Sequence, residues 1–147
     1  MLLARLIGIA LVLLAPTAHV AVAQAASAVT LRVVVRGLES NAGYVAYALF
    51  DSRTSYDEGE RPYRAGFAPI AERQSRVIVP SLPPGDYALK LFHDRNGNEQ
   101  IDLGAFRIPT EPYGFSNDAR SSFGPPPFER ARFRITDDPT VIEITVH

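Results

Sequence analysis

A period of two in the apolar residues is the feature that most limits the folds open to this chain. In residues 30–36, the apolar side chains of Leu31, Val33 and Val35 alternate with Arg32, Val34 and Arg36. Successive side chains of a β-strand point to opposite faces, so this pattern predicts a half-buried strand with one face toward water. No stretch carries a convincing apolar stripe at helical spacing. The chain is therefore predicted to fold mainly from β-strands.

Further segments repeat the pattern, at residues 43–50, 77–79, 87–93, 132–136 and 141–146. Turn residues are expected to join neighbouring strands as hairpins, at residues 39–42, 82–86 and 137–139. Residues 55–65 are expected to form a loop with one helical turn. Short strands of this kind, in a domain of about 120 residues, predict an antiparallel β-sandwich of about seven strands.

The N-terminus has the layout of a secretory signal. Arg5 precedes an unbroken apolar run from Leu6 to Ala15, and small residues follow up to Ala25. The alternative is an uncleaved anchor, but the run has about ten residues and a membrane-spanning helix needs about 20. We expect a signal peptide at residues 1–25 and a single domain at residues 26–147. The mature domain is expected to be periplasmic or secreted and not embedded in a membrane.

Composition narrows the partners of the mature domain. The chain has no cysteine, which excludes disulfide bonds and a lipid anchor on a cysteine. Its formal net charge is −1 at pH 7, and removal of the signal takes away Arg5 and no acidic residue. Nucleic-acid-binding domains carry a basic surface instead, so we expect no nucleic-acid partner. Lys90 is the only lysine.

Oxygen-bearing side chains occupy every second position directly after the predicted strand at residues 87–93. Gly97 lets this loop curl, and carboxylate and amide oxygens are the ligands that Ca²⁺ prefers. An EF-hand needs glycine and glutamate where Glu99 and Ala105 stand, so the site would be of another, weak kind, with a dissociation constant on the order of 10⁻⁴ to 10⁻³ M. The alternative is a metal-free turn at Asn96 and Gly97. The predicted calcium ligands are Asp94, Asn96, Asn98, Gln100 and Asp102.

Residues 104–128 combine prolines, glycines and aromatic rings, and they are expected to form a long irregular loop that is neither strand nor helix. Rings that stack and amides that give directional hydrogen bonds are typical of loops that bind sugars or peptides. A glycan or an envelope protein would be the partner of such a loop. The alternative is that its rings, at Tyr113, Phe115, Phe123 and Phe128, pin the loop to the sheet as a satellite core. The candidate ligand-binding residues are His93, Glu111, Tyr113, Phe115 and Asn117.

The turn at residues 82–87 resembles the turn of transthyretin-like (prealbumin-like) sandwiches. Over essentially the whole mature region, the chain resembles a bacterial exported family named domain of unknown function 2141. This resemblance rests on VTLRVVVRGLES, GYVAYALFD, SLPPGDYALKLFHDRNGN, IPTEPYGFSNDA and FGPPPFERARF. The chain departs from the family at Glu99, Arg107 and Pro112, where the family tends to have glycine. The resemblance implies an extracytoplasmic β-sandwich and implies no catalytic residue.

His93 and the acidic residues near it are the cluster best suited to acid-base chemistry. The chain has no nucleophile elbow and no cysteine, so serine- or cysteine-based hydrolysis has no support. We predict a non-catalytic exported module for binding or structure, with a calcium-type loop. The alternative is a periplasmic hydrolase that uses His93 and the neighbouring acids. A third interpretation is an accessory domain whose partner protein covers a face with Arg32, Arg36 and Lys90.

Overall fold

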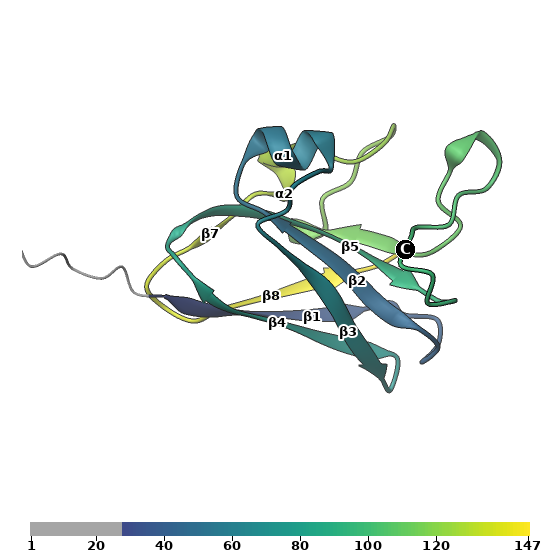
Figure 1. Ribbon diagram of the computed structural model, residues 1–147, viewed down its shortest axis with the longest axis horizontal. Coiled ribbons are helices and arrows are strands. Elements are labelled where there is room, and N and C mark those ends of the chain that lie inside the picture. Colours follow the sequence, from purple (N-terminus) through teal and green to yellow (C-terminus); the bar gives the residue numbers. More distant parts are fainter. Residues whose placement is uncertain (1–27) are drawn as a thin grey trace, which may run out of the picture.

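The computed structural model describes residues 28–147 (Figure 1). The predicted signal peptide lies outside the described residues. Eight strands form a sheet in the order β6-β5-β2-β3-β4-β1-β8, with β7 paired to β5 beside this path. The strands are β1 (Val29–Arg36), β2 (Tyr44–Phe50), β3 (Arg64–Ala71), β4 (Gln74–Leu82), β5 (Gly85–Asp94), β6 (Tyr113–Phe115), β7 (Phe133–Ile135) and β8 (Thr140–Thr145). The helical elements are α1 (Arg53–Glu58), α2 (Phe128–Ala131) and the 3-10 turns η1 (Ala105–Arg107) and η2 (Ser116–Asp118).

The sheet curls round until its two ends nearly meet. The backbone N–H of Tyr113 on β6 donates to the carbonyl of His147 at 3.2 Å, and the N–H of His147 donates back to the Tyr113 carbonyl at 3.1 Å. β1 and β8 run parallel, whereas the other paired strands are antiparallel. The prediction of a mainly β fold is confirmed. The expected antiparallel sandwich is corrected to a mixed, nearly closed, barrel-like sheet.

The three predicted hairpins are wrong. β1 pairs with β4 and β8, whereas β2 pairs with β3 and β5. The turn at residues 82–86 joins β4 to β5, which do not pair with each other. In the sheet, β4 lies between β3 and β1, whereas β5 lies between β2 and β6. The turn at residues 137–139 likewise joins β7, paired to β5, to β8, paired to β1. A turn determines where the chain reverses, but burial of the apolar faces determines which strands pair.

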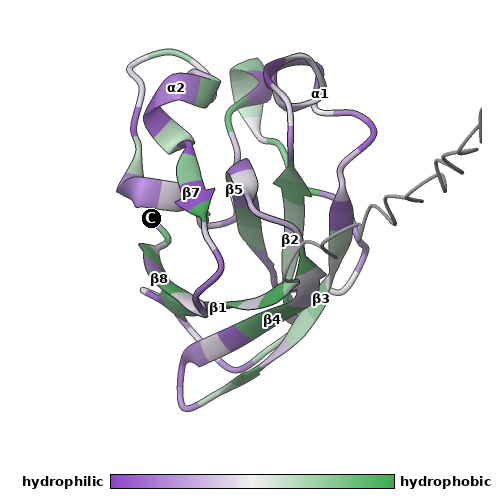
Figure 2. Ribbon diagram, turned by 90° about the vertical axis from the view of Figure 1, so that its left-hand side faces the viewer, coloured by the Kyte–Doolittle hydropathy of each residue, from purple (hydrophilic) through white to green (hydrophobic). Residues whose placement is uncertain are grey.

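Alternation correctly identified the inward-facing side chains of the strands that it detected. On β1, Leu31, Val33 and Val35 are fully buried, and on β5, Leu89 and Leu91 are buried in the same core. A second apolar cluster lies outside the barrel, between α1, α2 and the outer face of β5. It consists of Phe50, Tyr56, Ala88, Phe115, Phe128 and Ala131. Figure 2 shows α1 and α2 side by side at one end of the barrel, above this cluster.

Candidate functional site

The loop after β5 is organised around the buried carboxylate of Asp94. One Asp94 oxygen accepts the backbone N–H of Gly97 at 2.7 Å and that of Asn98 at 3.2 Å, and the other accepts the N–H of Glu99 at 2.8 Å. Asp94 is fully buried, so these bonds replace the water that the carboxylate would otherwise bind. The loop therefore curls around a carboxylate that belongs to its own first residue.

The Asp102 carboxylate closes the same loop from its other end. It accepts the side-chain amide of Asn96 at 2.7 Å and that of Asn98 at 2.9 Å. Four of the five predicted calcium ligands thus contact one another, and the fifth, Gln100, donates its backbone N–H to the Asn98 amide oxygen at 2.9 Å. Amide nitrogens rather than oxygens face Asp102, so a cation would require both amides to turn over.

Within residues 28–147, no group of three or more histidine and acidic side chains is arranged to hold a metal ion. The contacts described above are those of the metal-free turn that was the alternative to a calcium site. The same loop nevertheless contains two carboxylates, those of Asp94 and Asp102, and carboxylate oxygens are ligands that Ca²⁺ prefers. The assignment of calcium to the loop stays a prediction.

Glu111 anchors both ends of this loop, a role that its sequence context did not reveal. Its side chain is buried, and its two carboxylate oxygens accept the backbone N–H of Arg95 at 2.8 Å and that of Asp102 at 3.0 Å. The Arg95 guanidinium in turn donates to the Thr110 carbonyl at 2.7 Å. Glu111 was a candidate ligand-binding residue, but both of its oxygens contact the protein's own backbone.

His93 points into the protein. Its Nε2 lies 2.8 Å from the carbonyl oxygen of Ala42, which can only accept, so Nε2 carries the proton. The side chain is fully buried, and within the described residues Nδ1 has no hydrogen-bond partner. The cluster of His93 with acids therefore does not form a solvent-facing catalytic group.

The segment at residues 104–128 contains more regular structure than expected. Residues 113–115 form β6 and residues 116–118 form η2, which corrects the expectation of a loop without strand or helix. Asn117 donates its side-chain amide to the carbonyls of Arg130 and Arg132, at 3.1 and 2.8 Å, and so fixes the end of α2. Asn117 therefore acts here as a structural contact.

Some aromatic side chains of this segment are buried, as the satellite-core interpretation expected, and others are exposed, as a ligand-binding loop would require. Phe115 and Phe128 are buried in the second apolar cluster, where the Phe128 ring lies 5.6 Å from that of Tyr56. These two rings confirm the satellite core. Tyr113 is partly exposed, and Phe123 is 93% exposed. Phe123 is therefore no part of that core.

Sequence reasoning also missed Ser116, whose hydroxyl joins three elements. It is fully buried, accepts the N–H of Leu89 on β5 at 2.9 Å, and donates to the carbonyl of Ala131 in α2. A lone serine inside a polar loop carries no signal of this kind, because its partners are 27 and 15 residues away.

A large apolar groove lies on the outer face of β2, β3, β5 and β6 and has a volume of about 1150 Å³. The small side chains of Ala46 and Ala48, the backbone of Gly66 and the ring of Phe92 form its floor. The loops at residues 99–109 and 121–125 form its walls. Figure 1 shows both loops projecting beyond the sheet on the side that carries α1. No sequence pattern predicted the groove, because its lining comes from segments that lie far apart in the sequence.

Each wall of the groove carries an exposed phenylalanine. Phe106 is 96% exposed and Phe123 is 93% exposed. Phe106 and Arg107 also have positive φ angles, 58° and 60°, a conformation that side chains other than glycine rarely adopt. The N–H of Gly104 donates to the Ile108 carbonyl at 2.8 Å and thereby closes the turn around them. Backbone strain of this kind concentrates at functional sites.

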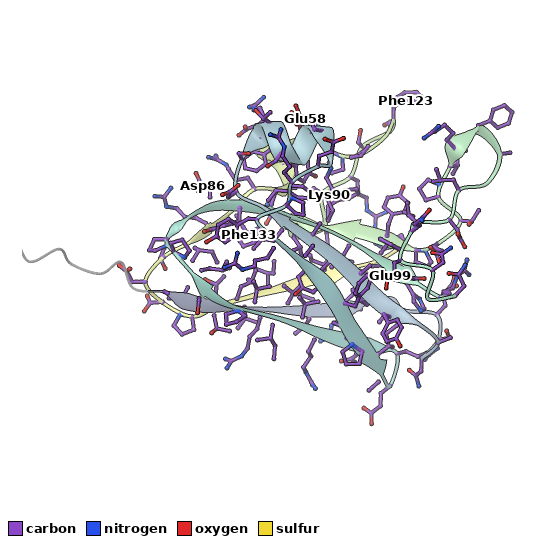
Figure 3. The ribbon with its side chains drawn as sticks, viewed as in Figure 1. Glu58, Asp86, Lys90, Glu99, Phe123 and Phe133 are labelled. Carbon is purple, nitrogen blue, oxygen red and sulfur yellow. The ribbon has the colours of Figure 1, made fainter. Side chains whose placement is uncertain are left out.

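Lys90 lies at the end of the groove next to α1 (Figure 3). Its ammonium donates to the Tyr56 carbonyl and lies 4.1 Å from the centre of the Tyr56 ring and 5.2 Å from that of Phe50. Burial lowers the pKa of Lys90, and the nearby Asp57 carboxylate opposes that shift. The accessory-domain interpretation placed Lys90 on one face with Arg32 and Arg36 of β1; in the sheet, β2, β3 and β4 lie between β5 and β1.

These observations define a mostly β, barrel-like domain with an apolar groove on its outer face. The chain belongs to the family described as "Uncharacterized protein conserved in bacteria (DUF2141)", whose model matches residues 33–143. No curated protein and no solved structure matches it. The resemblance to this family is confirmed, whereas the transthyretin-like character is not. No helix within residues 28–147 combines the length and apolar character that a membrane crossing requires.

Proposed function

We propose that the protein is an exported, non-catalytic binding protein whose ligand lies in the groove between Phe106 and Phe123. The observation that carries this proposal is the pair of almost fully exposed rings at the rims of an apolar groove. Exposed apolar patches on small domains mark binding surfaces, and ligand sites are concave and mostly apolar. A fold that needed these rings only for stability would bury them.

The lining favours an apolar small molecule over a glycan. Glycan recognition depends on several directed hydrogen bonds beside a stacking ring, but the floor of this groove consists of alanine and phenylalanine side chains and the backbone of a glycine. A ligand with a hydrocarbon body gains about 25 cal/mol for each Å² of apolar surface that leaves water. A glycan or an envelope protein, the partners expected from the sequence, are the competing outcomes.

The test is a titration of the purified domain with a neutral fluorescent hydrocarbon probe, N-phenyl-1-naphthylamine. The double variant Phe106→Ala, Phe123→Ala should bind the probe at least about tenfold more weakly, because about 1.4 kcal/mol corresponds to a factor of ten. The matched control is Ile78→Ala, Val141→Ala, which removes two exposed apolar side chains of β4 and β8 outside the groove lining. Equal probe affinity in both double variants would contradict the proposal.

We further propose that the loop at residues 94–102 binds Ca²⁺ and thereby stiffens one wall of the groove. The presence of the Asp94 and Asp102 carboxylates in one loop supports it, because carboxylate oxygens are ligands that Ca²⁺ prefers. Asp102→Asn is the discriminating variant: it keeps an acceptor for the amides and removes the charge that Ca²⁺ requires. Calorimetry should show millimolar binding to the wild type and none to this variant. Absence of heat in the wild type would end the calcium proposal.

The hydrolase alternative gains no support from the geometry. His93 is fully buried, and the carboxylates of Asp94 and Glu111 already accept backbone N–H groups.

The proposal that the chain is exported rests on residues 1–25. Its test is N-terminal sequencing of the protein from the native envelope fraction, where a mature chain that begins near Ala26 is expected.

A further inference from the structure

We infer that the ligand of the groove is an amphipathic anion, a hydrocarbon chain with a carboxylate head that binds the ammonium of Lys90. This inference rests on the proposed groove and adds the charge and orientation of its ligand. It predicts that the hydrocarbon runs across Ala48 and Ala46, away from α1, and that the head lies beside Phe50.

The position of Lys90 supports this orientation. On β5 it lies directly across from Ala48 of β2 and from Phe115 of β6, so its side chain leaves the outer face of the sheet at the groove floor. The ammonium ends near the C-terminus of α1, where the Tyr56 carbonyl accepts one N–H. An ammonium has three N–H donors. Within residues 28–147, Lys90 takes part in no ion pair.

The surroundings of Lys90 favour an anion over a neutral head. The rings of Phe50 and Tyr56 cover the ammonium and remove water from it, which is the main reason that its pKa is lowered. Asp57 is exposed to water and only partly offsets this effect. A carboxylate in the groove would supply charge-assisted hydrogen bonds, which are roughly twice as strong as neutral ones. The Lys90 ammonium thus has one protein acceptor and lines the groove.

The other charged residues of the lining are less suited to this role. Glu99 and Arg107 belong to the loop that forms the far wall, and both are exposed. Figure 3 shows Lys90 beneath α1 and Glu99 toward the opposite end of the sheet. An anion at Arg107 would remain in water, where ion pairs contribute little. An anionic head at Lys90 would also lie away from the Glu99 carboxylate and so avoid repulsion between like charges.

The test compares decanoate with decan-1-ol, which have the same chain length, by displacement of N-phenyl-1-naphthylamine at neutral pH. Wild-type protein should bind decanoate at least about tenfold more tightly than decan-1-ol. Lys90→Met keeps an unbranched apolar stem but removes the charge, so it should lose this preference while its affinity for decan-1-ol is unchanged. Unchanged decan-1-ol binding also shows that the variant is folded. Arg107→Met is the matched control and should keep the preference.

The outcomes separate the two proposals. If Lys90→Met still prefers decanoate, or if the wild type binds both compounds equally, the inference about Lys90 is wrong and the groove remains a ligand site. If neither compound displaces the probe from the wild type, both the inference and the apolar-ligand groove are wrong. If Arg107→Met loses the preference and Lys90→Met keeps it, the head lies at the far wall instead.

Discussion

Glu111→Gln should destabilise the domain strongly although it changes one atom. The two carboxylate oxygens of Glu111, which is itself buried, each accept a backbone N–H, from Arg95 at 2.8 Å and from Asp102 at 3.0 Å. Glutamine has one acceptor oxygen, so it can keep one of these bonds, and its NH₂ group then faces the other N–H. The substitution therefore removes one bond to a charged acceptor and leaves two donors opposed to each other.

The size of the effect follows from these contacts. A hydrogen bond to a charged group contributes about 1.5–3 kcal/mol, and an unsatisfied buried donor costs about 1–3 kcal/mol. Because Glu111 is only 2% exposed, water cannot replace the lost partner without a movement of the loop. We expect a loss of about 2–4 kcal/mol in the free energy of unfolding, out of the roughly 5–15 kcal/mol typical of small domains.

Urea unfolding measures this loss. The chain has no tryptophan, so far-UV circular dichroism is the suitable signal. The matched control is Glu99→Gln, which makes the same chemical change on an exposed side chain of the loop that Glu111 anchors. This control should stay within about 0.5 kcal/mol of the wild type. If Glu111→Gln also stays within that margin, the carboxylate does not hold the loop and the reasoning is refuted.

Two further predictions concern the backbone and the second apolar cluster. Gly43→Ala should lower the free energy of unfolding by about 2–4 kcal/mol, because a Cβ there would lie 1.7 Å from the Asp94 carbonyl oxygen. Gly124→Ala is the control: its φ is also positive, but nothing lies within 4 Å of the added Cβ, so the loss should be about 1 kcal/mol. Urea unfolding of the two variants measures the difference. Burial raises the pKa of the Tyr56 hydroxyl, which donates to the Pro126 carbonyl. The contribution of this hydroxyl to stability is therefore complete below about pH 10 and is lost as pH rises further, so Tyr56→Phe should lose less stability than the wild type between about pH 10 and 12.

Sequence periodicity predicted the strands whose inner faces alternate cleanly and missed those that do not. β1 and β5 each bury every second side chain in the barrel. β3 was missed because its exposed Phe67 and Pro69 are as apolar as the more buried Ala68 and Ile70, so apolar residues do not alternate with polar ones. Strand pairing was not predictable either, since the turn residues are compatible with a hairpin and with a corner alike.

The candidate site was predictable only where its partners are close in sequence. The spacing of Asp94 and Asp102 correctly indicated one polar loop, because their partners lie within a few residues. Glu111 binds the N–H groups of residues nine and sixteen positions before it, a relation that only the fold creates. From the sequence, Lys90 was placed on one face with Arg32 and Arg36. Its contacts with Tyr56 and Phe50, which are 34 and 40 residues before it, arise only from the fold.

The long segment after β5 combines a polar, buried base with an apolar, exposed tip, and this combination argues for binding. Asp94 and Glu111 use buried carboxylates to fix the base, whereas Phe106 at the tip is 96% exposed. Burying such a ring against the sheet would gain about 1.5–3 kcal/mol, so a loop selected for stability alone would fold down onto the groove. The anchored base instead holds the tip away from the floor and preorganises it, which lowers the entropy that a ligand must overcome. Any change that loosens the base, such as the loss of the Glu111 charge, should therefore weaken ligand binding even in molecules that remain folded.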